Sequence, residues 1–289
     1  MSAPFSKTIS IGSEAFSPGT ENKKSLSIEL LPDGFSFSVL DHQQFKYLIL
    51  ESFRARQVVT MAEWSGMLHQ MVRDNPLLAA SYHQVSISWF TTQLTLIPVS
   101  LYQQEQKDSY YQFANNLPPD HMVAQDRLNT LEAYGLYAIS TEVNNQLNQL
   151  FPGHRLRHSG TVLIESLLAT RQLNEWKASM VLHIRRKHFD VVLFEDQKLN
   201  YYNSFRYEEF GDLMYYLFFV LEQFGLDANA MDVLLVGEIS LDNDRFLALS
   251  QYFRKVSFIG RSDIYRYAQE FDALPHHYFY TLLNLNSCG

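Results

Sequence analysis

The sequence predicts a mixed α/β fold built from two related halves, and three observations support this prediction. A segment with three short strand-like runs occurs twice, at residues 26–53 and 180–205. An alternation of helical and strand-like patterns follows each segment. The two segments also carry similar residues 154 positions apart (189 − 35): Phe35 and Phe189, Asp41 and Glu195, Gln43 and Gln197, and Tyr47 and Tyr201. The order βββαβαβ, present twice, is typical of an α/β protein with an internal duplication.

Three strands are predicted at the start of the first half, over residues 26–31, 35–40 and 45–50. Pro32, Asp33 and Gly34 separate the first two strands, since proline fixes φ and glycine allows the positive φ of a tight turn. A helix is predicted over 58–74, because apolar residues recur at helical spacing until Asn75-Pro76 ends it. The other predicted elements are strands at 85–90, 94–101, 122–127, 135–140 and 154–157 and helices at 104–115, 141–150 and 161–173.

The second half repeats this order in a shorter form. Strands are predicted over 180–185, 189–194 and 199–203, with the first turn at Lys187-His188, and an apolar helix over 207–224 ends at Gly225. A strand at 232–236, a helix at 242–253 and a strand at 255–259 follow. Because side chains alternate along a strand, Tyr201 and Tyr202 should face opposite sides of the sheet. The predicted boundaries are 1–23 for a disordered tail rich in Ser, Thr, Gly and Pro, 24–175 for the first half and 176–289 for the second.

The composition favours a soluble, cytoplasmic protein. Of 289 residues, 46% are hydrophobic and 19% are charged, which supports a packed core and excludes general disorder. The net charge of -8 disfavours binding to nucleic acid. The longest apolar run, 213–221, is far shorter than the ~20 residues that span a bilayer, so no membrane insertion is expected. A single cysteine, Cys288, excludes an intramolecular disulfide, and no metal site is predicted.

The duplicated βββαβαβ pattern resembles the actin-like ATPase fold, which contains two ribonuclease H-like halves. That superfamily includes actin, sugar kinases and bacterial proteins of cell division and of pilus assembly. Two segments, SLSIELLPDGFSFSVLD at 25–41 and LLVGEIS at 234–240, further resemble an uncharacterised bacterial domain-of-unknown-function family with this fold. No activity comes with that family.

The superfamily resemblance implies where chemistry should lie. Its members bind phosphate at the first turn of each half, with an Asp-x-Gly pattern, and pass a glycine pair close to the adenosine. In the first half Glu29 stands for the acid, but Leu31 takes the glycine position. In the second half His183 and Arg185 stand at the acid and glycine positions, and Gly237 keeps one glycine of the pair with Glu238 as its neighbour. We therefore expect a degraded nucleotide site.

The first functional hypothesis is a non-catalytic interaction or assembly module, a pseudo-ATPase without cofactor or catalytic residues, that binds an unidentified protein partner or itself. The alternative is an ATP-dependent kinase or ATPase with an atypical Mg-ATP site, in which Asp33 or Glu29 would hold the metal. Gly34 would then lie at the first phosphate turn, and Gly237 and Glu238 would lie beside the adenine.

A separate hypothesis concerns the basic run Arg185-Arg186-Lys187, followed by His188. These side chains could bind an anion, or more weakly a nucleic acid, at a turn where the superfamily binds phosphate. The competing interpretation is a solvated hairpin turn, because short runs of charge are common on turns.

Overall fold

The computed structural model describes residues 5–14, 16, 19, 21–56, 61–170, 178–195, 198–240 and 244–287. The chain divides into two compact units. The first unit comprises residues 1–162, 263–273 and 281–289, and the second comprises residues 163–262 and 274–280. This division differs from the predicted boundaries at 24–175 and 176–289 in two ways: the second unit begins at residue 163, and two segments near the C-terminus return to the first unit.

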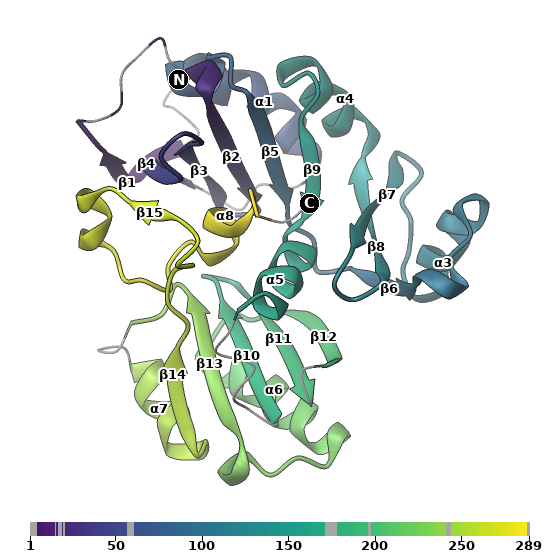
Figure 1. Ribbon diagram of the computed structural model, residues 1–289. Coiled ribbons are helices and arrows are strands. Elements are labelled where there is room, and N and C mark those ends of the chain that lie inside the picture. Colours follow the sequence, from purple (N-terminus) through teal and green to yellow (C-terminus); the bar gives the residue numbers. More distant parts are fainter. Residues whose placement is uncertain are drawn as a thin grey trace. The chain divides into compact units, whose positions relative to one another are not determined.

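A seven-stranded sheet forms the centre of the first unit, with strand order β1-β4-β3-β2-β5-β9 and β15 beside β4 (Figure 1). Neighbours among β2, β3 and β4 are antiparallel, whereas β5 and β9 continue the sheet parallel to β2. The strands are β1 (Phe5–Gly12), β2 (Lys24–Leu31), β3 (Gly34–Asp41), β4 (Lys46–Ala55), β5 (Gln84–Trp89), β9 (Arg155–His158) and β15 (Arg266–Tyr267). The predicted three-stranded meander is confirmed.

Helices cover one face of this sheet. They are α1 (Met61–Asp74), α2 (Pro76–Ala79) and α4 (Thr141–Leu150). Trp64, Leu68 and Met71 recur at helical spacing on α1, as Val143 and Leu147 do on α4, and all five join one buried cluster with the sheet. Asn75 lies between α1 and Pro76 and ends the long helix where the sequence predicts.

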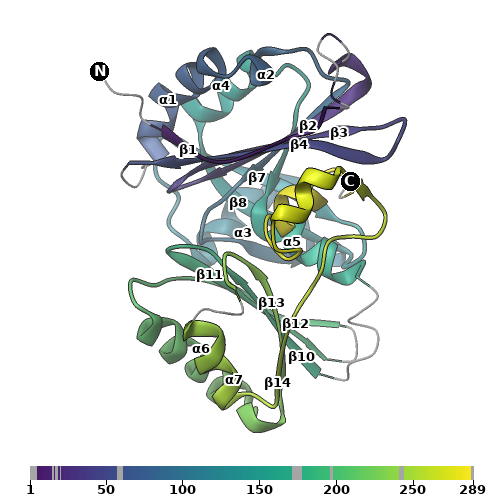
Figure 2. The same ribbon diagram turned by 90° about the vertical axis from the view of Figure 1, so that its left-hand side faces the viewer.

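The opposite face of the sheet contacts the helix α8 (Tyr280–Asn284) and the residues after it. The Tyr47 hydroxyl donates to the Leu283 carbonyl oxygen at 2.6 Å, and the Asn286 amide donates to the Ser27 hydroxyl at 2.8 Å. Leu282 and Leu285 are buried there. Figure 2 shows α8 on the side of the sheet away from α1 and α4.

The prediction of a disordered tail over 1–23 is wrong for residues 5–12, which form β1 and pair antiparallel with β4. The segment FSKTISIG is only moderately apolar, so its strand pattern is weak. Phe5 packs edge-on against Phe35 with ring centroids 5.0 Å apart, and Ile11 is buried. These contacts, made with residues distant in sequence, order a segment that has little local signal.

A second, three-stranded sheet belongs to the first unit, in the order β6-β8-β7. Its strands are β6 (Thr95–Pro98), β7 (His121–Leu128) and β8 (Ala133–Ser140), and the helix α3 (Lys107–Ala114) packs beside it. Tyr111 of α3 shares a buried cluster with Val123 and Leu136 of the sheet. The strands and the helix were each predicted from the sequence, but their grouping into a separate sheet was not. This small sheet and α3 are inserted in the chain between β5 and β9.

The second unit contains a five-stranded sheet in the order β12-β11-β10-β13-β14. With β10 taken as equivalent to β2, this order is the same as β4-β3-β2-β5-β9 in the first unit, with parallel β13 and β14. The strands are β10 (Ala178–Ile184), β11 (His188–Glu195), β12 (Lys198–Arg206), β13 (Asp232–Gly237) and β14 (Lys255–Phe258). The internal duplication predicted from the repeat is therefore confirmed in strand order and direction.

Helices cover both faces of the second sheet. On one face lie α6 (Phe210–Phe224) and α7 (Asp244–Tyr252) (Figure 2), and on the other lies the second-unit part of α5 (Ser159–Leu168). Tyr201 packs in the cluster of the first face and Tyr202 in that of the second, as strand alternation predicts. Gly225 ends α6 in the left-handed conformation, at φ 62°.

The repeat also preserves one packing contact. Phe35 stacks on Phe53 with ring centroids 4.6 Å apart, and Phe189 stacks on Phe205 at 5.4 Å. Both pairs join the middle strand of a meander to its third strand. Within the part of the chain described, no helix combines the length and apolar character needed to cross a membrane.

Candidate functional site

The first turn of the second unit is a tight hairpin between β10 and β11. Ile184 pairs with Phe189, and the Arg185 N–H donates to the His188 carbonyl oxygen at 2.8 Å. Only Arg186 and Lys187 remain in the turn. The turn therefore lies one residue earlier than the predicted Lys187-His188, because His188 already belongs to β11 and pairs with Arg206.

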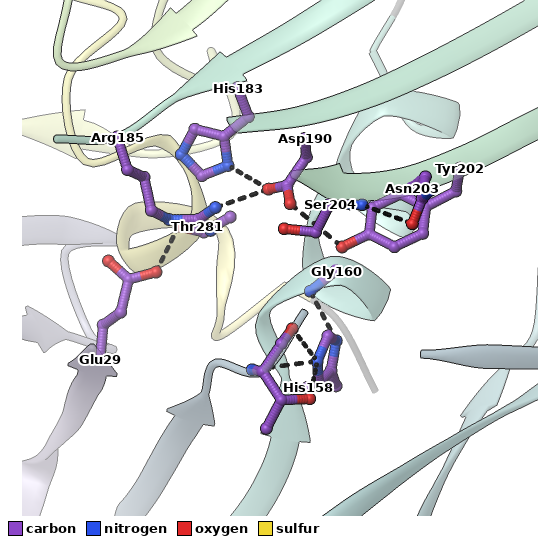
Figure 3. Close-up of polar contacts among 11 residues, drawn as sticks. Glu29, His158, Gly160, His183, Arg185, Asp190, Tyr202, Asn203, Ser204 and Thr281 are labelled. Carbon is purple, nitrogen blue, oxygen red and sulfur yellow. Dashed lines mark hydrogen bonds and ion pairs between the residues drawn. The ribbon is translucent and has the colours of Figure 1, made fainter. Parts of the chain in front are cut away.

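A buried ionic cluster stands behind this turn (Figure 3). Arg185 Nη1 lies 2.5 Å from Asp190 Oδ2, and the two side chains are 7% and 0% exposed. His183 Nδ1 lies 3.3 Å from the same oxygen, and the Tyr202 hydroxyl donates to Asp190 Oδ1 at 3.3 Å. Register produces the cluster, because β11 places Asp190 directly opposite His183.

The charges in this cluster are fixed by burial and by pairing. Burial opposes a charged Asp190, but the Arg185 guanidinium and His183 outweigh it and hold the pKa of that carboxyl well below its usual range. Burial, assisted by the Arg185 charge, lowers the pKa of His183 to about 4. Burial and the Asp190 charge raise the pKa of Tyr202. At neutral pH the cluster is an internal ion pair with a neutral imidazole beside it.

Gly237 and Glu238, predicted beside an adenine, lie against the end of β10. The Gly237 N–H donates to the His277 carbonyl oxygen at 2.9 Å, and the Glu238 N–H donates to the Ile184 carbonyl oxygen at 2.7 Å. Gly237 has φ +96°, and a Cβ there would stand 2.2 Å from the Ile184 oxygen. The packing of this unit therefore accounts for the glycine, while the Glu238 side chain is exposed.

His277 lies in a turn and packs next to Gly237 and Glu238. Its ring stacks on Phe258 with centroids 3.9 Å apart, and its Nε2 bonds to the Ile239 carbonyl oxygen. Burial lowers the pKa of His277.

The first turn of the first unit is equally tight. Leu31 pairs with Gly34, which leaves Pro32 and Asp33 in the turn, and the Asp33 carbonyl oxygen accepts from the Ala55 N–H at 2.8 Å. Gly34 has φ +151°, and a Cβ there would stand 2.0 Å from the Phe53 carbonyl oxygen. The close contact with β4 is therefore sufficient to explain why a glycine is needed here, and no bound ligand has to be invoked.

Glu29, the predicted acid of the first half, is 4% exposed. Its Oε1 accepts a hydrogen bond from the Thr281 hydroxyl at 2.6 Å (Figure 3). Thr281 follows 252 residues later in the chain, and nothing in the local sequence of β2 indicates this partner. The carboxylate expected to face a metal is instead bonded within the first unit.

The basic run does not form one cationic surface. Arg185 is paired with Asp190, and Lys187 is paired with Glu208, which also contacts Arg206 at 2.7 Å. Arg186 is exposed. Two of the three side chains predicted to bind an anion are therefore already paired with carboxylates.

A second buried polar cluster lies in the first unit, at the start of α5. This cluster was not predicted from the sequence, because its members are far apart along the chain. Asp126 Oδ2 accepts from the His158 N–H at 2.7 Å and from the Thr161 hydroxyl, and Oδ1 accepts from the Tyr137 hydroxyl at 3.2 Å. Burial raises the pKa of Asp126, although Arg157 and these donors oppose the shift. Asp126 thereby holds the residue that precedes α5 and the Thr161 side chain of its first turn.

His158 has its tautomer set by its neighbours. Its Nδ1 accepts from the Gly160 N–H at 3.0 Å, so Nε2 carries the proton and donates to the Thr91 carbonyl oxygen at 3.0 Å. Both ring nitrogens are therefore used in the fold. Among the residues that the structure describes, no group of three or more His, Cys, Asp or Glu side chains could hold a metal ion, and Cys288 lies outside those residues.

Residues 13–256 match a family described as "Protein of unknown function (DUF3822)". The chain belongs to that family. No curated protein sequence matches the chain. The family match spans both units and includes the two hairpins and Gly237.

Solved structures establish the fold of this family member. A protein from Bacteroides thetaiotaomicron, described as having an actin-like ATPase fold and unknown function, is 21% identical, with a TM-score of 0.75 over 93% of this chain and 98% of that chain. The PilM-PilN type IV pilus biogenesis complex contains a chain that is 11% identical, with a TM-score of 0.63 and coverage of 91% and 98%. The ethanolamine utilization protein EutJ from Carboxydothermus hydrogenoformans is 11% identical, with a TM-score of 0.52 and coverage of 96% and 93%. The chain has the actin-like ATPase fold.

Proposed function

We propose that this DUF3822 protein is a non-catalytic interaction or assembly module of the bacterial cytoplasm, on a scaffold whose nucleotide-binding turns have been replaced. One observation carries the proposal. The first hairpin of each unit is closed by only two residues, Pro32-Asp33 and Arg186-Lys187, with the strands paired up to them.

A phosphate cradle needs several backbone N–H groups that converge on one point and are not used elsewhere. In the second unit the Arg185 N–H is used by His188. In the first unit Gly34 is paired with both Leu31 and Arg54 in the sheet. Two-residue turns of this kind offer no run of donors to a triphosphate.

The side chains behind the turns also favour a structural role. Hydrated magnesium needs a carboxylate that faces water or phosphate. Glu29 is buried and accepts from Thr281, and Asp190 is buried and paired with Arg185. Both carboxylates therefore stabilise their own unit.

The assembly part of the proposal draws support from a fold relative. The PilM-PilN structure is a complex of type IV pilus biogenesis, so a chain of this fold takes part in a protein assembly. Because fold alone does not carry function, the proposal for this chain stays at the level of a protein partner or self-association.

A thermal melt with and without millimolar Mg-ATP tests the proposal. Ligand at about 100–1,000 times its Kd would stabilise the native state by roughly 2–4 kcal/mol, which is readily seen as a higher Tm. We expect no shift and no ATP hydrolysis. The matched variant is Arg186→Glu, which reverses the exposed charge of the turn and leaves the buried cluster intact.

A saturable rise in Tm with Mg-ATP that Arg186→Glu abolishes would contradict the proposal. It would favour instead an ATPase or kinase with an atypical site that uses the turn at 185–187. The same pair of proteins, titrated with inorganic phosphate at low salt, tests whether this turn binds anions at all.

A further inference from the structure

The outer face of α6 is aromatic. The helix buries Leu213, Leu217, Val220 and Leu221 against the sheet of the second unit. On the opposite side Tyr215, Phe218 and Phe219 are 66%, 38% and 45% exposed. Tyr252 of α7 extends this surface, because it is 48% exposed and its ring centroid lies 5.3 Å from that of Phe218. We call these four side chains the α6 aromatic face.

This face is unusual for a helix in water. A helix at a protein surface normally carries polar residues on its outer side. At ~200 Å² for each ring, the exposed fractions leave roughly 400 Å² of aromatic surface in contact with solvent. Patches of that size on a folded protein are frequently interaction sites.

We propose that a second copy of this chain covers the α6 aromatic face, with the two α6 helices antiparallel about a two-fold axis between Phe218 and Phe219. A two-fold interface uses the same patch on both subunits, so the patch must be complementary to itself. The exposed residues of α6 meet this condition.

The self-complementarity depends on Tyr215 and Glu222. They are seven residues apart, two helical turns, so both lie on the exposed side, with the proposed axis midway between them. In the antiparallel pair each Tyr215 stands opposite Glu222 of the partner subunit. A phenol donates well to a carboxylate, so an aromatic centre is flanked by two equivalent hydrogen bonds.

The charges of α6 are consistent with this arrangement. Asp212 and Glu222 are its only charged residues. About the same axis Asp212 stands opposite Gly225, at the end of the helix, so no carboxylate faces another carboxylate. Gly211, also exposed, leaves room for close approach near the ends of the contact.

Self-association through α6 rests on the proposed function, because it is one form of the proposed assembly role. The dimer and the absence of nucleotide binding can nevertheless be disproved independently of each other. Nucleotide binding concerns the hairpin turns, whereas dimer formation concerns α6. A Mg-ATP response with an intact dimer, or a monomer with no Mg-ATP response, would each contradict one proposal and leave the other standing.

Sedimentation velocity on the full chain over a range of concentrations tests the inference. We expect a reversible monomer–dimer equilibrium. Tyr215→Glu places two like charges at each end of the contact and should weaken the dimer by about tenfold or more. Adding Glu222→Lys to that variant sets opposite charges across the same pairs and should restore the affinity. Both positions are exposed, so the fold should be kept, as circular dichroism can verify.

The control is Phe113→Glu. Phe113 is 95% exposed on α3 of the first unit, and its replacement adds the same charge away from α6. The dimer should persist in this variant. A chain that is monomeric at all concentrations, a dimer insensitive to Tyr215→Glu, or a loss that Glu222→Lys does not reverse would each overturn the inference.

Discussion

Gly237 and Ile184 are in such close contact that a single Cβ at position 237 would stand 2.2 Å from the Ile184 carbonyl oxygen. The same oxygen accepts the Glu238 N–H at 2.7 Å. The ends of β10 and β13 are thereby joined beside the buried His183. The glycine that the superfamily resemblance places beside an adenosine is thus required by contacts within one unit.

Replacement of this glycine tests that interpretation. Gly237→Ala should lower the free energy of unfolding by about 3 kcal/mol or more, because the added Cβ meets backbone at a positive φ. Urea denaturation measures the change. Gly260→Ala is the control, since a Cβ there meets nothing within 4 Å. Equal midpoints for the two variants would show that the close contact does not determine stability.

The Arg185–Asp190 ion pair should be strongly coupled. Arg185→Met leaves a buried carboxylate without its guanidinium and should cost ~3–5 kcal/mol of stability. Combining it with Asp190→Asn removes both charges and should cost less than the sum of the two single variants. Chemical denaturation of the four proteins gives the coupling energy. Arg254→Met, which removes an exposed ion pair with Asp232, should change the midpoint little.

His183 should make the protein less stable in mild acid. Its pKa is lowered to about 4 in the folded protein, against 6.5 in the absence of burial. The unfolded chain therefore binds the proton first, and stability present above pH 6.5 falls as the pH approaches 4. The loss between pH 6.5 and pH 5 should be about 2 kcal/mol. Asp190, whose pKa is lowered, contributes its own loss as the pH falls from the usual range of a carboxyl toward the lower pKa of the folded state.

Urea denaturation at several pH values measures this slope in the wild type, in His183→Gln and in His69→Asn. The His183 variant should show a shallower decline, with a remainder from the other histidines whose pKa burial lowers, such as His154 and His277. His69 is exposed on α1, so its variant should decline as the wild type does. Identical slopes in all three proteins would contradict a buried neutral His183.

The bond between Thr281 and Glu29 should hold α8 to its sheet. Thr281→Val keeps the shape but removes the hydroxyl donor to a buried carboxylate, which should cost about 2 kcal/mol. Hydrogen exchange of α8 should rise in this variant. Ser287→Ala, at an exposed hydroxyl that bonds locally to Asn284, should leave both quantities near wild type. If hydrogen exchange of α8 is unchanged in Thr281→Val, the hydrogen bond to Glu29 does not hold α8 to the sheet.

Sequence patterns predict the repeated part of this fold well, for physical reasons. Buried strands and amphipathic helices such as α1 and α6 carry dense apolar periodicity, and Asn75-Pro76 and Gly225 mark where helices end. The segment 5–12 was missed because only its contacts with β4 and Phe35 favour a strand. The return of 263–273 and 281–287 to the first unit was missed because their short elements have no periodicity.

The side-chain contacts of the candidate site could not be predicted from local sequence patterns. His183 and Arg185 could be singled out from the positions that the superfamily resemblance gives them, but Asp190 enters only through the hairpin register, and the predicted turn was one residue away. A one-residue change of register exchanges the faces of a strand, so the ion pair could not be predicted with that turn. Thr281 is separated from Glu29 by 252 positions, and no local pattern encodes that distance.

The hydrogen bonds from Thr281 and Asn286 to β2 have a consequence for synthesis on the ribosome. Glu29 and Ser27 emerge 252 and 259 residues before their partners. At ~5–20 residues per second, the nascent chain spends roughly 13–50 s with this face of the first sheet uncovered. During that interval the whole second unit is made and can collapse. Completion of the first unit therefore depends on translation of the second, and a chaperone has its longest opportunity to bind at β2.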